Sequence, residues 1–178
     1  MFKVDDSLFV CIDIQEKLLP LISNKDEVVK NSNILLGGAE ILGAKILISE
    51  QYTRGLGVTH SEIKAPTNAK VLEKTSFGIF GNSEMKKFIK KTSCKHLVLF
   101  GIETHVCVLQ TVLQAVKLGY KCIVAGDAVG SRNEKNYLLA LDFFRSLKVA
   151  VLPTESVLFN LLQDKQHEKF KEISSLVK

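Results

Sequence analysis

The fold of this chain is decided by one stretch, GIETHVCVLQT, which occupies residues 101–111. The apolar run HLVLF at residues 96–100 precedes it and predicts a buried strand. Apolar residues then recur at helical spacing as far as Gly119, a residue type that commonly ends helices. The pattern therefore places Cys107 where a buried strand turns into a helix.

This position of Cys107 suits a nucleophile. The first turn of a helix carries unpaired backbone N–H groups and the positive end of the helix dipole. Both features lower the pKa of a thiol, and the N–H groups can stabilise negative charge on a substrate oxygen. The sequence predicts a nucleophilic cysteine of lowered pKa, and simple core packing is the alternative for this residue.

Short apolar runs alternate with helical patterns along the whole chain. Strands are predicted at residues 7–12, 44–49, 70–73, 96–100, 120–125 and 148–152. Helices are predicted at about residues 26–43, 83–91, 108–118, 133–147, 155–162 and 167–177, with a long loop at 50–69. This alternation predicts an α/β fold: a three-layer αβα sandwich on a six-stranded, mainly parallel sheet of Rossmann-like topology. Residues 1–178 are expected to form a single domain.

Three of these helices carry local signals that predict particular contacts. Gly37 and Gly38 lower the helix propensity of their segment, so we expect a close packing contact that compensates. Ser83 is expected to cap the helix at 83–91. The helix at 133–147 is expected to bury Leu138, Leu141 and Phe144.

The composition narrows the class of protein. The net charge is +5, but the lysines are scattered, and the densest group fits one exposed helix face at residues 86–91. Aromatic residues do not interleave with basic ones, so no nucleic-acid partner is expected. No stretch of the sequence reaches membrane-spanning length and no signal peptide is recognised, so we expect a cytoplasmic protein without a membrane partner.

The four cysteines predict neither disulfides nor a metal site. Cys11, Cys94, Cys107 and Cys122 show no C-x-x-C or disulfide-like spacing, and Cys11 and Cys122 fall inside apolar runs that favour core packing. The His and Cys pairs around residues 94–107 lack the spacing of a zinc site. The glycine motifs of dinucleotide and P-loop sites are also missing from the sequence, so no metal and no cofactor is predicted.

Polar residues follow the predicted strands at the edge where α/β proteins bind ligands. Asp13 follows the first strand, Lys74 the third, Cys107 the fourth and Asp127 the fifth. Ligands of open α/β sheets bind outside the carboxyl ends of the strands. In an acyl transfer there, Asp13 would accept the thiol proton, Lys74 would keep Asp13 charged and stabilise the thiolate, and Cys107 would attack.

Three motifs in register resemble the isochorismatase-like cysteine hydrolase family: CIDIQ at 11–15, EKTSF at 73–77 and GIETHVCV at 101–108. The match covers nearly the whole chain. Further segments are similar to the branch called isochorismatase-domain-containing proteins. These are EQY at 50–52, GLG at 55–57, DA at 127–128, SR at 131–132 and ESVLF at 155–159.

The resemblance implies a catalytic Asp-Lys-Cys triad, which maps onto Asp13, Lys74 and Cys107. It also implies a cis peptide bond between Ile102 and Glu103, an oxyanion hole made by the backbone N–H groups of Glu103 and Cys107, and a homo-oligomer. The metal motif Asp-x-His of the family's nicotinamidases is replaced here by QYT at 51–53, so metal binding and nicotinamidase activity are not expected.

The resulting hypothesis is a cysteine hydrolase that cleaves a C–N (amide or imide) or ester bond of a small molecule through a Cys-acyl intermediate. Two alternatives remain: a binding or scaffold protein without turnover, and a redox sensor in which Cys94 resolves an oxidised Cys107. For His105, a proton donor beside the pocket and a solvent-facing side chain stay equally open. The candidates for substrate contact are Gln15, Gln51, Tyr52, Phe77, Thr104 and His105.

Overall fold

The computed structural model describes residues 2–178, which form an α/β fold around one sheet. The sheet of these residues has six strands, each parallel to its neighbours, in the order β3-β2-β1-β4-β5-β6. The strands are β1 (Ser7–Ile12), β2 (Lys45–Gln51), β3 (Lys70–Lys74), β4 (His96–Ile102), β5 (Lys121–Gly130) and β6 (Ala150–Leu152). The predicted fold class is confirmed.

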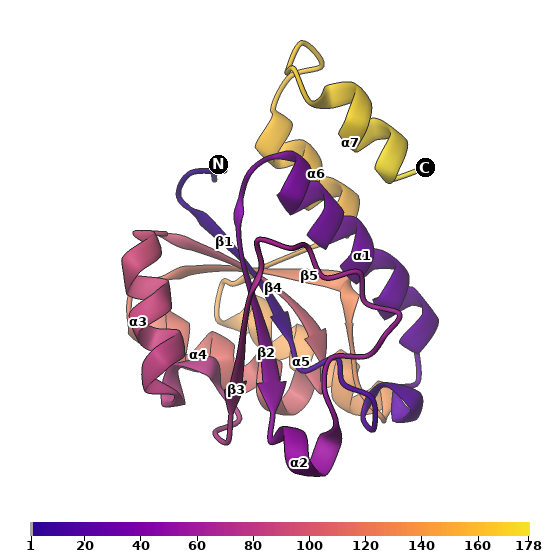
Figure 1. Ribbon diagram of the computed structural model, residues 1–178, viewed down its shortest axis with the longest axis vertical. Coiled ribbons are helices and arrows are strands. Elements are labelled where there is room, and N and C mark those ends of the chain that lie inside the picture. Colours follow the sequence, from indigo (N-terminus) through magenta and orange to yellow (C-terminus); the bar gives the residue numbers. More distant parts are fainter. Residues whose placement is uncertain (1) are drawn as a thin grey trace.

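Helices cover both faces of the sheet (Figure 1). They are α1 (Lys25–Ile41), α2 (Thr53–Leu56), α3 (Ser83–Thr92), α4 (Leu109–Lys117), α5 (Glu134–Ser146), α6 (Thr154–Leu162) and α7 (Phe170–Leu176). On one face α1 packs with α6, and α7 lies against α1; on the other face lie α3, α4 and α5. Short 3-10 turns at Leu19–Leu21 and Ile79–Gly81 and a π-helical turn at Thr104–Val108 lie between these elements. Over the described range, no helix combines the length and the apolar character needed to cross a membrane.

The core lies on both sides of the central strands. All residues of β1 are buried, and in β4 only the first residue is partly exposed. Strands covered on both faces need apolar side chains on both, which explains their continuous apolar runs. Cys11 and Cys122 are buried in this core, as predicted.

The order of the strands reverses between β1 and β4. From β1 the chain moves outward through β2 to β3, and from β4 it moves the opposite way through β5 to β6. The connections that leave β1 and β4 therefore diverge and open a crevice outside the carboxyl ends of these two strands. Asp13 follows β1 at this crevice, and the turn that carries Cys107 follows β4.

Two glycines in α1 bring the C-terminal helices close to it. A Cβ atom on Gly38 would lie 2.5 Å from the side chain of Leu158 in α6. A Cβ atom on Gly37 would lie 3.4 Å from Leu176 of α7. The predicted close packing is confirmed, and its tighter contact is at Gly38.

Several predicted boundaries and contacts are corrected. The long loop at 50–69 contains the short helix α2, and β5 continues to Gly130 because its pairing with β4 resumes after an irregularity. Asn82 rather than Ser83 caps α3, since its side chain accepts two N–H groups of the first turn at 2.9 Å. In α5, Leu138 is exposed because it lies off the face that packs on the sheet, whereas Leu141 and Phe144 are buried as predicted.

Candidate active site

The first polar group at the crevice is the carboxylate of Asp13. Its backbone takes a left-handed conformation with φ 54°, which Asp tolerates better than most residues, and its N–H donates to the carbonyl of Ser49 at 3.0 Å. The side chain is fully buried. Oδ1 accepts the hydroxyl of Ser49 at 2.7 Å, and Oδ2 accepts the ammonium of Lys74 at 2.6 Å. Three backbone and side-chain contacts therefore fix the carboxylate in place.

Lys74 reaches Asp13 from two strands away. It ends β3, and because β2 lies between β3 and β1, the backbones of these two strands are about 10 Å apart. The side chains of Lys74 and Asp13 bridge this gap together. The residue is 1% exposed, and its Nζ also donates to Gln51 Oε1 at 2.7 Å. A buried ammonium is stable only with charged and polar partners, and here it has both. The sequence prediction that Asp13 and Lys74 converge is therefore met by a direct ion pair.

Cys107 lies in the π-helical turn directly after β4 and is 5% exposed. Burial raises the pKa of its thiol well above the ordinary value, the negative charge of Asp13 and a hydrogen bond to it raise this pKa further, and the charge of Lys74 acts the other way. The predicted lowering of the pKa is wrong for the resting protein, because removal of the thiol from water outweighs the helix terminus. The thiol, the acid and the amine nevertheless lie together.

The turn that carries Cys107 differs from the family expectation. Residues 2–178 contain no cis peptide bond, so the bond between Ile102 and Glu103 is trans, and the predicted cis bond is wrong. The chain instead turns at Glu103, whose backbone is left-handed with φ 57° and ψ 58°. Its carbonyl accepts the N–H groups of Val106 at 2.8 Å and Val108 at 3.4 Å, the two residues that flank Cys107.

Gln15 and Gln51, both candidates for substrate contact, bond to each other and to the protein. Gln15 is fully buried; its Oε1 accepts the Gln51 N–H at 2.7 Å, and its Nε2 donates to the carbonyls of Gln51 at 3.0 Å and Gly57 at 2.6 Å. Gln51 donates through Nε2 to the carbonyl of Thr75 at 2.7 Å while its Oε1 accepts from Lys74. Gln51 therefore holds the ammonium of Lys74 in place, and Gln15 holds Gln51.

Tyr52 and Phe77 are exposed on the loops that follow β2 and β3. The N–H of Tyr52 donates to the carbonyl of Lys74 at 2.9 Å, which holds its loop against the end of β3. A hollow of about 350 Å³ opens there. Its walls are formed by Tyr52, Arg54, Glu73, Lys74, Thr75 and Asn82. Tyr52 therefore lines the same hollow as Lys74, whereas Phe77 does not line it.

Thr104 and His105 contact the end of β5. Thr104 is buried and donates through Oγ1 to the carbonyl of Gly130 at 2.9 Å. His105 is partly buried, and its Nδ1 lies 3.0 Å from the hydroxyl of Ser131. The ring of His105 therefore does not simply face solvent, because Ser131 and Asn136 contact its two nitrogens.

Two residues of the site were not predicted. Ser49, which donates to Asp13, is a polar residue at the end of the apolar run ILI, and that position was its only signal in the sequence. Arg132 binds the carboxylate of Glu103 through Nε at 3.1 Å and Nη2 at 3.3 Å. Its partner is distant in sequence, so pattern reasoning could not pair them.

The structure separates Cys94 from Cys107. Cys94 precedes β4 and Cys107 follows it, so the seven residues of the strand hold them about 20 Å apart. A disulfide requires Cα atoms within about 7 Å, and the predicted role of Cys94 as a resolving thiol is therefore wrong. In the part of the chain that the structure describes, no group of three or more His, Cys, Asp or Glu side chains is arranged to hold a metal ion.

The sheet order and the crevice outside β1 and β4 define a Rossmann-like α/β protein. Residues 7–156 match the family model of the Isochorismatase domain. The chain therefore belongs to the isochorismatase family, as its motifs predicted.

Curated relatives of this family cover nearly the whole chain. Isochorismatase domain-containing protein 1 of Danio rerio is 36% identical over 172 residues, which are 97% of this chain and 61% of that protein. The chain thus spans about three fifths of the length of that relative. Isochorismatase family protein 1B of Dictyostelium discoideum is 35% identical, with 97% of this chain and 85% of that protein covered.

Solved structures share the fold. The MAR1 ribonuclease of Caenorhabditis elegans is 29% identical with a TM-score of 0.94 and covers 99% of this chain and 91% of its own. YcaC of Escherichia coli, an octameric hydrolase of unknown specificity, has a TM-score of 0.88 at 22% identity, with 98% and 88% covered. YcaC of Pseudomonas aeruginosa, solved with covalent acrylamide, has a TM-score of 0.88 at 23% identity, with 98% and 90% covered.

Proposed function

We propose that this protein is a cysteine hydrolase that cleaves a C–N or ester bond of a small molecule through an acyl-enzyme on Cys107. The observation that carries the proposal is the buried Lys74–Asp13 ion pair at 2.6 Å beside the buried thiol of Cys107, on whose pKa both charges act. A buried acid and amine next to a cysteine are costly to maintain in a core, and they supply the proton acceptor that a thiol of raised pKa needs.

In the first half of the reaction, Asp13 accepts the proton of the Cys107 thiol as Sγ attacks the carbonyl carbon. The negative charge that develops on the carbonyl oxygen is received by the backbone N–H groups of Cys107 and Glu103. The proton then passes from Asp13 to the leaving nitrogen or oxygen as its bond to carbon breaks. An amine, amide or alcohol departs and a thioester remains on Sγ.

In the second half, Asp13 accepts a proton from water as the water oxygen attacks the thioester. The bond from carbon to Sγ breaks, a carboxylic acid is released, and the proton returns to the thiol. Lys74 keeps Asp13 ionised between steps and stabilises the thiolate, while Ser49 and Gln51 hold the acid and the amine in their positions. No group outside the chain is required to balance these steps.

The test is a screen of small amides, imides and esters against the wild type, Cys107→Ala and the control Cys122→Ala. Acrylamide serves as a second probe, since it is bound covalently in the YcaC structure of P. aeruginosa. We expect turnover and an acrylamide adduct in the wild type and in Cys122→Ala, and loss of both in Cys107→Ala. Equal turnover or equal adduct in Cys107→Ala would contradict the nucleophile assignment, and a binding protein would show neither turnover nor selective labelling.

A second candidate function is cleavage of RNA, which the 29% identical MAR1 ribonuclease of C. elegans suggests despite the sequence expectation of no nucleic-acid partner. The lysines on the outer side of α3, at residues 86–91, offer the positive surface that RNA would need. A ribonuclease assay with Cys107→Ala as the control separates this candidate: RNA cleavage that persists in the variant does not use the proposed site.

We also propose that the chain forms a homo-oligomer. The octameric assembly of E. coli YcaC supports the proposal, as do apolar side chains that α4 and α5 expose next to each other. These are Leu113, Val116, Leu139 and Phe143. Light scattering of the wild type and of Leu139→Glu tests it: we expect an oligomer that the charged variant dissociates, and a monomeric wild type would contradict it.

A further inference from the structure

We propose that Arg132 is a positioning residue for the Cys107 turn, because it completes a side-chain clasp that ties residues 103–105 to residues 130–132. This inference rests on the proposed cysteine hydrolase function. The clasp consists of three contacts, one from each of three consecutive residues: Glu103 with Arg132, Thr104 with Gly130, and His105 with Ser131. They join the end of β4 to the end of β5, and Cys107 lies two residues beyond.

The strongest contact of the clasp is at the carboxylate of Glu103. Oε1 accepts the backbone N–H of Arg132 at 3.2 Å and its Nε at 3.1 Å, and Oε2 accepts Nη2 at 3.3 Å. His105 Nε2 lies 3.8 Å from the same Oε2. A carboxylate that is 7% exposed needs such donors, and a two-pronged guanidinium fixes its direction as well as its charge.

The other side of the clasp is anchored independently. The carbonyl of Ser131 accepts both the N–H and the hydroxyl of Ser23, at 3.1 Å and 3.0 Å. Asn24 donates to the carbonyl of Val129 at 3.1 Å. The end of β5 is therefore held in place by the connection between β1 and α1. It offers a fixed anchor for the side chains of residues 103–105 that bond to it.

The clasp matters for chemistry because of where Glu103 lies. Its left-handed backbone carries one of the two N–H groups proposed to receive the oxyanion, and its carbonyl closes the turn around Cys107. Without the guanidinium, the Glu103 carboxylate keeps only the backbone N–H of Arg132 and the more distant His105. The Glu103 side chain would then turn toward water, and the peptide groups on either side of Glu103 would rotate with it. An N–H that moves by a fraction of an ångström loses much of its effect on a developing charge.

Arg132 can be replaced without opening the core, since its side chain is 59% exposed. A matched control is present on α5: Arg145 is 56% exposed and pairs with Asp142 at 2.9 Å, also at the protein surface. The variants Arg132→Met and Arg145→Met therefore remove the same group at a similar exposure, from a buried carboxylate in the first case and from an exposed one in the second. Arg132→Lys retains the charge but only one point of contact.

Two electrophiles separate positioning from a merely structural effect. When Sγ bonds to the terminal alkene carbon of acrylamide, the alkene electrons move onto the carbonyl oxygen, and the α-carbon then takes a proton. Iodoacetamide reacts by displacement of iodide and builds no charge on oxygen. Only the acrylamide reaction therefore needs the two N–H groups in place.

The experiment measures both rate constants at Cys107 by peptide mass spectrometry, with the melting temperature as a check on folding. In Arg132→Met we expect the acrylamide rate to fall about ten-fold, a fraction of the loss that follows removal of a whole oxyanion donor, and the iodoacetamide rate to stay within about two-fold. Arg132→Lys should recover part of the acrylamide rate, and Arg145→Met should match the wild type in both.

Equal acrylamide rates in Arg132→Met and Arg145→Met would overturn the positioning role, as would an equal fall with both reagents. Failure of the proposed function has a different signature, because acrylamide would then label the wild type and Cys107→Ala alike. With any substrate found by the screen, we expect Arg132→Met to lower kcat and to leave KM within about two-fold.

Discussion

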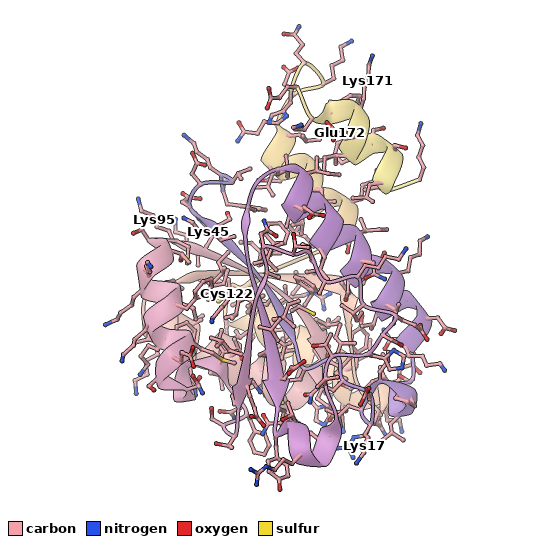
Figure 2. The ribbon with its side chains drawn as sticks, in the orientation of Figure 1. Lys17, Lys45, Lys95, Cys122, Lys171 and Glu172 are labelled. Carbon is pink, nitrogen blue, oxygen red and sulfur yellow. The ribbon has the colours of Figure 1, made fainter. Side chains whose placement is uncertain are left out.

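The carboxyl edge and the amino edge of the sheet each hold a hollow and a buried cysteine, but they differ in charge. At the amino edge a hollow of about 440 Å³ lies beside Cys122 at the start of β5. At the carboxyl edge the hollow is smaller, about 350 Å³, and Cys107 lies near the buried ion pair. Figure 2 shows Lys45 and Lys95 toward the amino edge, with Lys17 beside α2 at the other.

The two thiols share one property and differ in another. Burial raises the pKa of both, to about 12 for Cys122 and still higher for Cys107. Of the two, only Cys107 also has an acid and an amine as neighbours: the charge of Asp13 raises the pKa of its thiol, and the charge of Lys74 lowers it. The size of a hollow and the presence of a buried cysteine therefore do not distinguish the candidate active site from the amino edge. The buried pair of opposite charges, Asp13 and Lys74, does.

The largest expected effect is on turnover at the carboxyl edge. Asp13→Asn removes the proton acceptor and should lower kcat/KM about 10²- to 10⁴-fold. Asp127→Asn is the control, because Asp127 also lies late in a strand but accepts the N–H and hydroxyl of Thr154 at the start of α6. Equal losses in the two variants would remove the distinction between a catalytic and a structural acid.

The next effect is on stability. Lys74→Met leaves a buried carboxylate without its counter-ion and should lower the free energy of unfolding by about 3–5 kcal/mol. At the amino edge, Lys45→Met removes only an exposed lysine that donates to the carbonyl of Thr92, which should cost about 1 kcal/mol. Urea unfolding measures both. The double variant of Lys74→Met and Asp13→Asn should be more stable than Lys74→Met alone, and a further loss would argue against charge as the cause.

A smaller effect concerns the pH dependence of labelling. Because only thiolates react with iodoacetamide and both pKa values are raised, labelling of Cys107 and Cys122 should still increase above pH 9. Asp13→Asn removes a negative charge that raises the Cys107 pKa, so its profile should move to lower pH while that of Cys122 stays. Peptide mass spectrometry resolves the two sites, and parallel movement of both profiles would contradict this account.

The smallest effect is expected at the amino edge itself. Cys122→Ala removes a buried packing group and should lower the free energy of unfolding by about 1 kcal/mol with turnover unchanged. Thermal unfolding and the substrate assay measure these together. A loss of turnover here would mean that the amino edge also takes part in the reaction.

Contacts between distant parts of the chain could not be predicted from the sequence, whereas the ends of the strands could. Asp13 and Lys74 could be placed at one sheet edge because strand ends are visible as the ends of apolar runs. The support by Ser49 and Gln51 could not be predicted, since it joins β2 to residues on two other strands. The face of α5 that packs on the sheet was also misjudged at Leu138, because periodicity fixes a stripe only to within one neighbouring position.

The sequence by itself determined the alternation of strands and helices, the parallel sheet and the edge at which acid, amine and thiol emerge. These follow from local patterns of apolar residues and need no knowledge of neighbours. Only the tertiary structure decided the ionisation of Cys107, the trans peptide before Glu103 and the clasp to Arg132. Those depend on burial and on charges brought together across the sheet, and no stretch of chain contains them alone.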